Sequence, residues 1–115
     1  MKLVSLIAGG ILLFSANAHA SSQTEIGHLL EFVATTDCQY ERNGSFHSGM
    51  EAVEHIKKKY DYYVDDIKTA EDFIKYSATK SVMSGKYYLA HCANNAPIKS
   101  RDWLLNELKE YRANR

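Results

Sequence analysis

The chain has 115 residues, and its 14 Lys and Arg residues balance its 14 Asp and Glu residues to a formal net charge of zero. This length allows one domain behind a short targeting segment and no second domain. A balanced charge supplies no field of one sign, which argues against an electrostatic grip on nucleic acid or on an anionic membrane.

Residues 1–20 have the pattern of a cleaved secretory signal peptide. Lys2 precedes a short apolar run over residues 3–14, and Ala18-His19-Ala20 forms an A-x-A cleavage site. The run is shorter than the roughly 20 apolar residues of a spanning helix. No Cys follows the cut to accept a lipid anchor. We therefore expect cleavage after Ala20, which leaves residues 21–115 as a single small globular domain in the periplasm, without stable membrane insertion.

The exported domain begins with a predicted helix and a predicted hairpin. Ser22 opens a capping box, and apolar residues at helical spacing continue to about Ala34. Residues 38–42 and 45–47 alternate as two strands. Asn43-Gly44 joins them, and this pair favours a tight hairpin because both residues tolerate positive φ.

Two further helices are predicted in the middle of the chain. Ser48 opens a second capping box, and the helix after it carries an apolar face that extends to Ile67. Thr69 caps a shorter helix. The first of these helices is expected to bury Val53, Ile56, Tyr60, Tyr63, Val64 and Ile67, and the second to bury Phe73, Ile74, Ser77 and Ala78.

The last third of the chain predicts a strand, a loop and a helix. Ser84-Gly85 forms a turn into an aromatic strand over residues 87–92. Residues 94–100 contain the only proline and are expected to form a loop. Ser100 is expected to cap the final helix, which turns Trp103, Leu104, Leu108 and Tyr111 inward.

The element order α-β-β-α-α-β-α predicts an α+β fold, in which about four helices cover a small three-stranded antiparallel sheet. Cys38 begins the first strand and Cys92 ends the last, so antiparallel pairing brings them together. Two thiols in an oxidising compartment indicate one disulfide. A redox-active or catalytic Cys is the alternative, but there is no C-x-x-C pair, and the neighbouring Asp37 would raise the pKa of a Cys38 thiol.

The sequence offers no strong catalytic, cofactor or metal motif. Ser77-Ala78-Thr79-Lys80 matches the S-x-x-K pattern of serine acylases, but about one such match is expected by chance in this composition. Glu51 and His55 share a helix face, where a solvent-facing pair is favoured over a weak metal contact. We therefore predict no catalytic residue, no metal ligand and no cofactor.

A polar grouping is the best candidate site. His55 and Lys59 lie at the border of the long helix's apolar face, while Lys58 is expected to point away. Arg42 at the hairpin and Lys86 before the last strand could join them as a site for an anion or a carboxylate. The alternative is that Arg42 only flanks the turn and the lysines lie over hydrophobic neighbours with their ammonium groups in water.

The eight tyrosines are too many to face one core, so some are expected at the surface. Exposed Tyr is favoured at interfaces. Tyr40 or Tyr88 on a sheet face or edge could therefore dock a partner. The alternative, equally open here, is that Tyr serves as a core residue with a wet edge in a thin domain.

These segments resemble the YfeK-like family of small exported bacterial proteins, which carry a domain of unknown function. The resemblance rests on Cys38-Gln-Tyr-Glu-Arg-Asn-Gly, Glu51-Ala-Val-Glu-His-Ile-Lys-Lys-Lys-Tyr, Ala70-Glu-Asp-Phe-Ile, Ser84-Gly-Lys-Tyr-Tyr and Trp103-Leu. It implies a Gram-negative periplasmic protein and transfers no activity. Relatives often have proline where this chain has Tyr87. The matching positions here are Arg42, Asn43, Gly44, His55, Lys59, Glu71 and Lys86.

The leading functional hypothesis is a non-enzymatic binding or interaction protein of the cell envelope, with Arg42, His55, Lys59, Lys86 and Tyr88 at its site. Its partner would be an envelope protein or a small anionic ligand. One alternative is a small enzyme or enzyme inhibitor acting on cell-wall material, with His55 beside Glu51 or Glu71 in a concave pocket. Another is a structural accessory in envelope stress.

Overall fold

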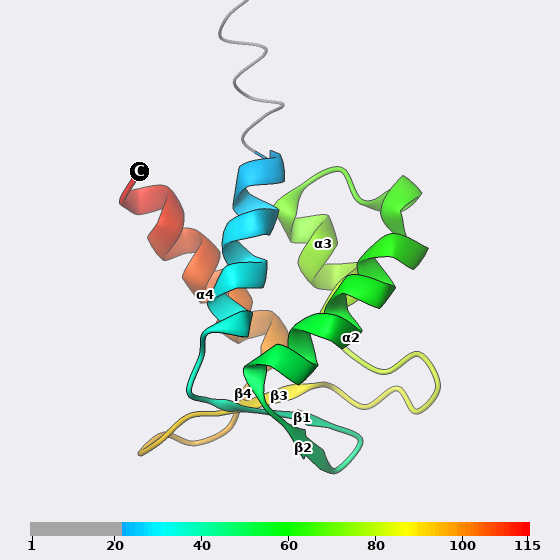
Figure 1. Ribbon diagram of the computed structural model, residues 1–115, viewed down its shortest axis with the longest axis vertical. Helices are drawn as coiled ribbons and strands as arrows, with labels where there is room; N and C mark the ends of the chain where they lie inside the picture. Colours follow the sequence, from blue (N-terminus) through cyan, green and yellow to red (C-terminus); the bar gives the residue numbers. More distant parts are fainter. Residues whose placement is uncertain (1–21) are drawn as a thin grey trace, which may run out of the picture.

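A computed structural model describes residues 22–115 (Figure 1). The signal segment and its expected cleavage site lie outside the described residues. The first described helix covers residues 22–34. It is followed by β1 (Gln39–Arg42), β2 (Ser45–His47), α2 (Gly49–Tyr62), the 3-10 turn η1 (Val64–Asp66), α3 (Ala70–Ser77), β3 (Leu89–His91), β4 (Ile98–Lys99) and α4 (Ser100–Ala113).

The fold is α+β, with helices gathered over one face of an antiparallel sheet (Figure 1). The strand order is β2-β1-β3-β4. Tyr40 is paired with His47 on one side and with Ala90 on the other. The expected three strands are corrected to four in the described residues, because residues 98 and 99 pair with β3. A two-residue strand directly after a proline has no periodicity of its own, so only its neighbour reveals it.

The hairpin and two helix starts confirm the local sequence signals. Asn43 and Gly44 both have positive φ, at 50° and 83°, as the tight turn requires. Ser48 and Thr69 each accept a hydrogen bond from the backbone N–H three residues later. In both cases the carboxylate at that later position accepts a hydrogen bond from the backbone N–H of the cap residue. Both capping boxes are therefore complete. These signals act within a few residues and therefore survive folding unchanged.

The long helix is shorter than its apolar pattern predicts. α2 ends at Tyr62, and Val64, expected in the core, lies in η1 with 48% of its surface exposed. Ile67 is nevertheless buried, because the chain becomes extended there before Thr69 caps the next helix. Ile67 therefore reaches the core from the extended segment after η1 and not from the apolar face of α2.

Two predicted caps are wrong, and in each case a side chain expected to take part in the cap binds a distant residue. Ser22 already lies within the first helix, and the carboxylate of Glu25 binds the Arg112 guanidinium at 2.9 and 3.0 Å. Lys99 occupies the N-cap position of α4 without a side-chain bond. The Ser100 hydroxyl is buried and pairs with Tyr40 instead. A long-range partner has replaced the local one at both sites.

The core lies between the helices and the inner face of the sheet. Its fully buried members include Leu29, Tyr40, Ile56, Phe73, Ile74, Leu104 and Leu108. Trp103 and Tyr111, expected inward, are only partly buried. Cys38 and Cys92 form the predicted disulfide across β1 and β3, with their Cα atoms 4.3 Å apart. None of the helices within residues 22–115 combines the length and the hydropathy that crossing a bilayer requires.

Candidate functional site

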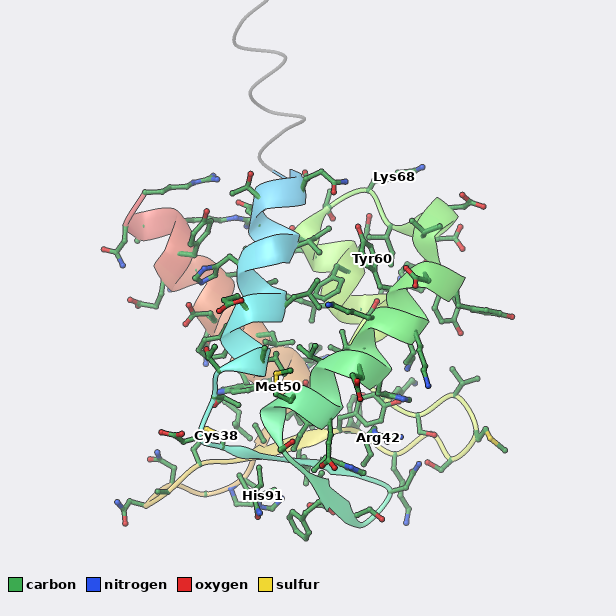
Figure 2. All side chains as sticks on the ribbon, viewed as in Figure 1. Cys38, Arg42, Met50, Tyr60, Lys68 and His91 are labelled. Atoms are coloured by element: carbon green, nitrogen blue, oxygen red, sulfur yellow. A yellow bond between two sulfur atoms is a disulfide. The ribbon has the colours of Figure 1, made fainter. Side chains whose placement is uncertain are left out.

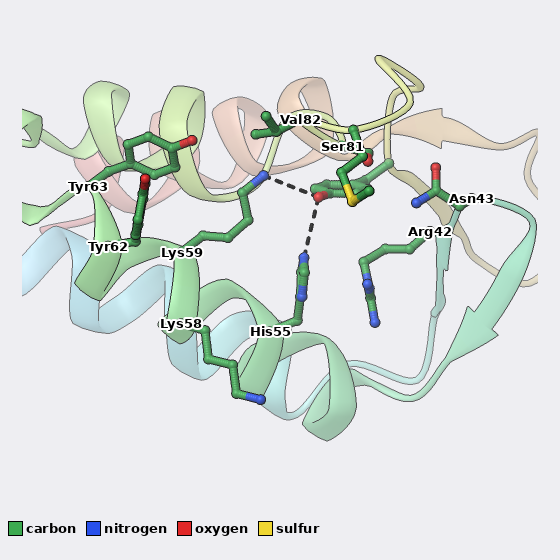
Figure 3. Close-up of a pocket in the computed structure, with 11 residues that line it drawn as sticks. Arg42, Asn43, His55, Lys58, Lys59, Tyr62, Tyr63, Ser81 and Val82 are labelled. Atoms are coloured by element: carbon green, nitrogen blue, oxygen red, sulfur yellow. Dashed lines mark hydrogen bonds between the residues drawn. The ribbon is translucent and has the colours of Figure 1, made fainter.

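A cleft of about 350 Å³ opens between α2, the hairpin turn and the loop after α3 (Figure 3). Its volume falls at the lower end of the range of small-molecule sites. It is lined by Arg42, Asn43, His55, Lys58, Lys59, Tyr62, Tyr63, Ser81, Val82, Met83 and Tyr88. Four of the five predicted binding residues are in this set.

Arg42, His55, Lys59 and Tyr88 come from three separate segments of the chain and meet in the cleft (Figure 3). Arg42 ends β1 and lies between α2 and the loop over residues 81–86 (Figure 2). Lys86 does not join them. Its side chain is exposed, and its backbone carbonyl accepts a hydrogen bond from the Ser81 N–H at 2.9 Å to close the loop.

The Tyr88 hydroxyl links the two helical residues of the cleft. Lys59 Nζ lies 3.1 Å from it and His55 Nε2 lies 3.3 Å from it. A Lys ammonium can only donate, so Tyr88 accepts from Lys59 and can donate its own hydrogen to His55. Lys59 Nζ also donates to the Lys80 carbonyl at 2.9 Å. The ammonium is therefore fixed at one place on the floor of the cleft.

Burial and neighbouring positive charges lower the pKa values of two residues in the cleft. Burial, followed by the charges of Arg42 and Lys59, lowers the pKa of His55 from 6.5 to about 4. Burial and the Arg42 charge also lower the pKa of Lys59. His55 is consequently neutral at pH 7, which suits its role as acceptor from Tyr88. A bound anion would counter the part of each pKa shift that the neighbouring cations cause.

Arg42 carries an unpaired donor in this setting. Its Nε atom is buried without a hydrogen-bond partner among the described residues. Buried polar atoms are almost always paired, and leaving one unpaired costs about 1–3 kcal/mol. A guanidinium presents donors in a planar fork that fits a carboxylate or phosphate. Because Nε itself has almost no accessible surface, a ligand in the cleft would meet the guanidinium through its terminal nitrogens.

The lining side chains that the structure describes include no carboxylate. Glu51 and Glu71, expected beside His55 in an enzyme, lie elsewhere. Glu51 is 62% exposed at its side chain and completes the α2 cap, and Glu71 binds Arg112 at 2.7 Å. The arrangement expected for a carboxylate–histidine pair is therefore contradicted at these two residues. Among the described residues that line the cleft, none supplies a counter-ion for its positive charge.

The predicted tyrosine docking surface is also corrected. Tyr40 and Tyr88 are each only 2% exposed, because Tyr40 in β1 and Tyr88, one residue before β3, belong to the core. Tyr88 contributes its hydroxyl to the cleft rather than a ring to a partner. The exposed tyrosines are Tyr62, at 81%, and Tyr87, at 40%. Tyr62 stands at the rim of the cleft, where α2 ends.

Several lining residues were missed by the sequence reasoning. Lys58 was expected to point away from the site but lines it. Val82 and Met83 are 73% and 98% exposed in a loop without periodicity, so no pattern marked them. Their one available signal was two apolar residues directly before the Ser84-Gly85 turn. Within residues 22–115, no three His, Cys, Asp or Glu side chains gather as metal ligands do.

Residues 20–112 match the sequence profile of a family of unknown function, DUF5329. The chain is also 36% identical over 74 residues to the Uncharacterized protein YfeK of Salmonella typhimurium. That alignment covers 64% of this chain and 62% of the Salmonella protein, so it spans less than two thirds of that relative. No solved structure matches the chain. Because the family profile covers most of the sequence, the chain belongs to the DUF5329 family.

Proposed function

We propose that this protein is a non-enzymatic binding protein of the cell envelope whose basic cleft takes a small anionic ligand. The observation that supports this most directly is the gathering of Arg42, Lys58 and Lys59 in a cleft that no described carboxylate lines. A carboxylate or phosphate placed there would accept from Arg42 and from Lys59, in charge-assisted bonds that are about twice as strong as neutral ones.

The walls of the cleft add a preference for a ligand with an apolar body. Tyr62, Val82 and Met83 are highly exposed at its rim. Covering such surface stabilises a complex by about 25 cal/mol per Å². An aliphatic or aromatic carboxylate combines both requirements, because its charged end reaches Arg42 while its hydrocarbon part covers the rim. We take this as the ligand chemistry of the site.

The proposal is tested by the shift in melting temperature on adding octanoate. We expect octanoate to raise the melting temperature of the wild type, because a ligand that binds only the folded state stabilises it. Arg42→Gln should abolish the shift, whereas Arg101→Gln, which removes a surface charge outside the cleft, should keep it. Absence of any shift in the wild type would favour a structural accessory instead, and an unchanged shift in Arg42→Gln would reject the site.

We also propose that the protein reaches the periplasm through its signal peptide. Support comes from the Lys2, apolar and A-x-A pattern of residues 1–20 and from the disulfide, which is typical of oxidising compartments. Mass spectrometry of protein released from the periplasm should give the mass of residues 21–115. Recovery of the full-length chain in the cytoplasm alone would reject this localisation.

A further inference from the structure

A second cleft adjoins the first and shares its central residues. It has a volume of about 300 Å³, and Lys59, Tyr63, Ser81 and Val82 line both clefts. Lys59 stands at the junction, where the Lys80 carbonyl and the Tyr88 hydroxyl hold its ammonium. The two clefts are therefore neighbours, and the fixed ammonium of Lys59 lies where they meet.

The second cleft brings cations of its own. Lys75 at the end of α3 and Lys80 after it line this side. Among the described residues, neither second-cleft lysine forms an ion pair within 4.0 Å. Their ammonium groups lie 5.3 Å from the Tyr76 ring and 6.0 Å from the Tyr87 ring. Such contacts contribute only about 0.5–1 kcal/mol at exposed sites, so both groups stay available to a ligand.

Lys80 is the stronger candidate of the two. The charge of Lys75 is already felt by the neighbouring Asp72, whose pKa is lowered mainly by a backbone hydrogen bond from Lys68 and, to a smaller degree, by Lys75. Asp72 itself does not line either cleft. No acidic side chain lines the second cleft within the described residues, as is also true of the first.

From this arrangement we propose that the joined clefts bind one linear ligand with an anionic group at each end. One end is held by Arg42 and Lys59, the other by Lys80 with support from Lys75, and the apolar middle lies over Tyr63 and Val82. The chemical class is a dicarboxylate with a hydrocarbon spacer. This inference rests on the proposed function and extends it from a single anionic group to two.

The length of the spacer is the property that a two-ended site must select. Once the first carboxylate is bound, the second binds as an intramolecular event, with an advantage that is largest when the spacer matches the distance between the cation groups. General attraction of a doubly charged ligand would instead favour all lengths alike. The test therefore compares a series of lengths.

Isothermal titration calorimetry tests the proposal with three matched pairs of ligands. Adipate is compared with hexanoate, suberate with octanoate, and sebacate with decanoate, so that each pair has the same number of carbon atoms. We expect one dicarboxylate to bind about tenfold more tightly than its matched monocarboxylate. The double variant Lys75→Gln/Lys80→Gln should remove that advantage, so that each dicarboxylate binds it no more tightly than the matched monocarboxylate does. The control Lys57→Gln/Lys109→Gln also removes two positive charges, but from residues outside both clefts. It should keep the advantage of the dicarboxylate.

The outcomes separate this inference from the function on which it rests. If monocarboxylates bind and depend on Arg42, but no dicarboxylate has an advantage, the two-ended site is rejected and the anion site stands. An equal advantage at every length, or equal losses in both double variants, also rejects it in favour of general charge attraction. If neither ligand class binds, both proposals fail.

Discussion

Tyr40 and Ser100 share a buried hydrogen bond of 2.8 Å that joins the central strand β1 to the first residue of α4. Both residues are almost completely buried, at 2% and 0% exposure. Tyr40→Phe removes one hydroxyl and leaves the other without a partner, which should lower the free energy of unfolding by about 1–3 kcal/mol.

A double-mutant cycle measured by urea denaturation checks this bond. Ser100→Ala should also destabilise the protein, and the double variant should lose less than the sum of the two single losses, because no orphaned hydroxyl remains. Additive losses would show that the two hydroxyls do not interact.

Two glycines should respond to alanine with opposite signs. A Cβ on Gly49 would collide with the Val33 carbonyl oxygen and press on Thr36, whereas a Cβ on Gly27 would meet nothing within 4 Å. Gly49→Ala should therefore destabilise the protein by about 1–3 kcal/mol, as overpacking does. Gly27→Ala, inside the first described helix, should stabilise it by up to about 1 kcal/mol. Thermal unfolding of both variants measures the contrast, and a stabilised Gly49→Ala would contradict this packing.

Arg112 ties three helices together. Its guanidinium binds Glu25 on the first helix at 2.9 Å and Glu71 on α3 at 2.7 Å. The hydrogen bonds from Arg112 lower the pKa of both carboxyl groups. Arg112→Gln should destabilise the protein by about 1–3 kcal/mol at pH 7, because the Glu25 side chain is only 5% exposed.

The surface pair of Arg101 and Asp102 is the matched control for Arg112. Both of its side chains are more than 40% exposed, so Arg101→Gln should cost no more than about 1 kcal/mol. The contribution of the two glutamates is present above their ordinary pKa of 4.5 and is lost as the pH falls through their lowered folded values. The difference between Arg112→Gln and the wild type should therefore shrink below pH 4.5. Equal losses in both variants at pH 7 would contradict a special role for Arg112.

His55 should make the protein less stable in mild acid. Its pKa is about 4 in the folded state and 6.5 ordinarily, so below pH 6.5 the unfolded chain takes up a proton that the folded chain refuses. The stability that neutral His55 contributes is fully present above pH 6.5 and is lost as the pH falls toward 4. Between pH 7 and pH 5 the wild type should lose roughly 1 kcal/mol from this group, after allowance for its partial exposure.

His55→Gln keeps a hydrogen-bonding side chain but does not titrate. Its free energy of unfolding, from urea curves at pH 7 and pH 5, should fall by less than that of the wild type over the same interval. Equal falls in the two proteins would exclude His55 as the source. The glutamates bound by Arg112 act at lower pH, so they do not obscure the comparison.

The disulfide should carry much of the stability of so small a domain. Cys38 and Cys92 are separated by 54 positions, and closing a loop of this size stabilises the folded state by about 4 kcal/mol in the chain-entropy account. Cys38→Ser/Cys92→Ser should lose about this amount in guanidinium denaturation. The reduced wild type is the control and should behave like the double variant. Two free thiols in protein isolated from the periplasm would contradict the bridge in the exported protein.

Local signals were enough to predict much of this fold. The Asn43-Gly44 turn and the capping boxes at Ser48 and Thr69 depend on residues within three positions of one another, so nothing distant had to be known. The disulfide was also predictable. Cys38 precedes one strand and Cys92 follows its antiparallel neighbour, so pairing of the two strands brings both cysteines to the same end.

The site was predictable only in part. Helical spacing placed His55 and Lys59 together, and Arg42 joined them as expected from the hairpin. Tyr88 was predicted on an exposed docking surface, but it is buried and contributes its hydroxyl to the cleft. Lys86 did not, because the turn at Gly85 uses its backbone and leaves its side chain in solvent. Val82 and Met83 entered the cleft through loop geometry, which no periodic pattern encodes.

The sequence by itself determined the disulfide and all the elements except β4 and η1, together with their order, since these follow from turn chemistry, caps and apolar spacing. Only the tertiary structure decided that β4 exists, that Ser100 binds Tyr40 instead of capping α4, and that Glu25 and Glu71 are held by Arg112 far from His55. The physical reason is competition. A polar side chain can form a hydrogen bond with a local partner or with a distant one. Where packing brings the distant partner within reach and buries it, as for Ser100 and Tyr40, the buried bond is the stronger one.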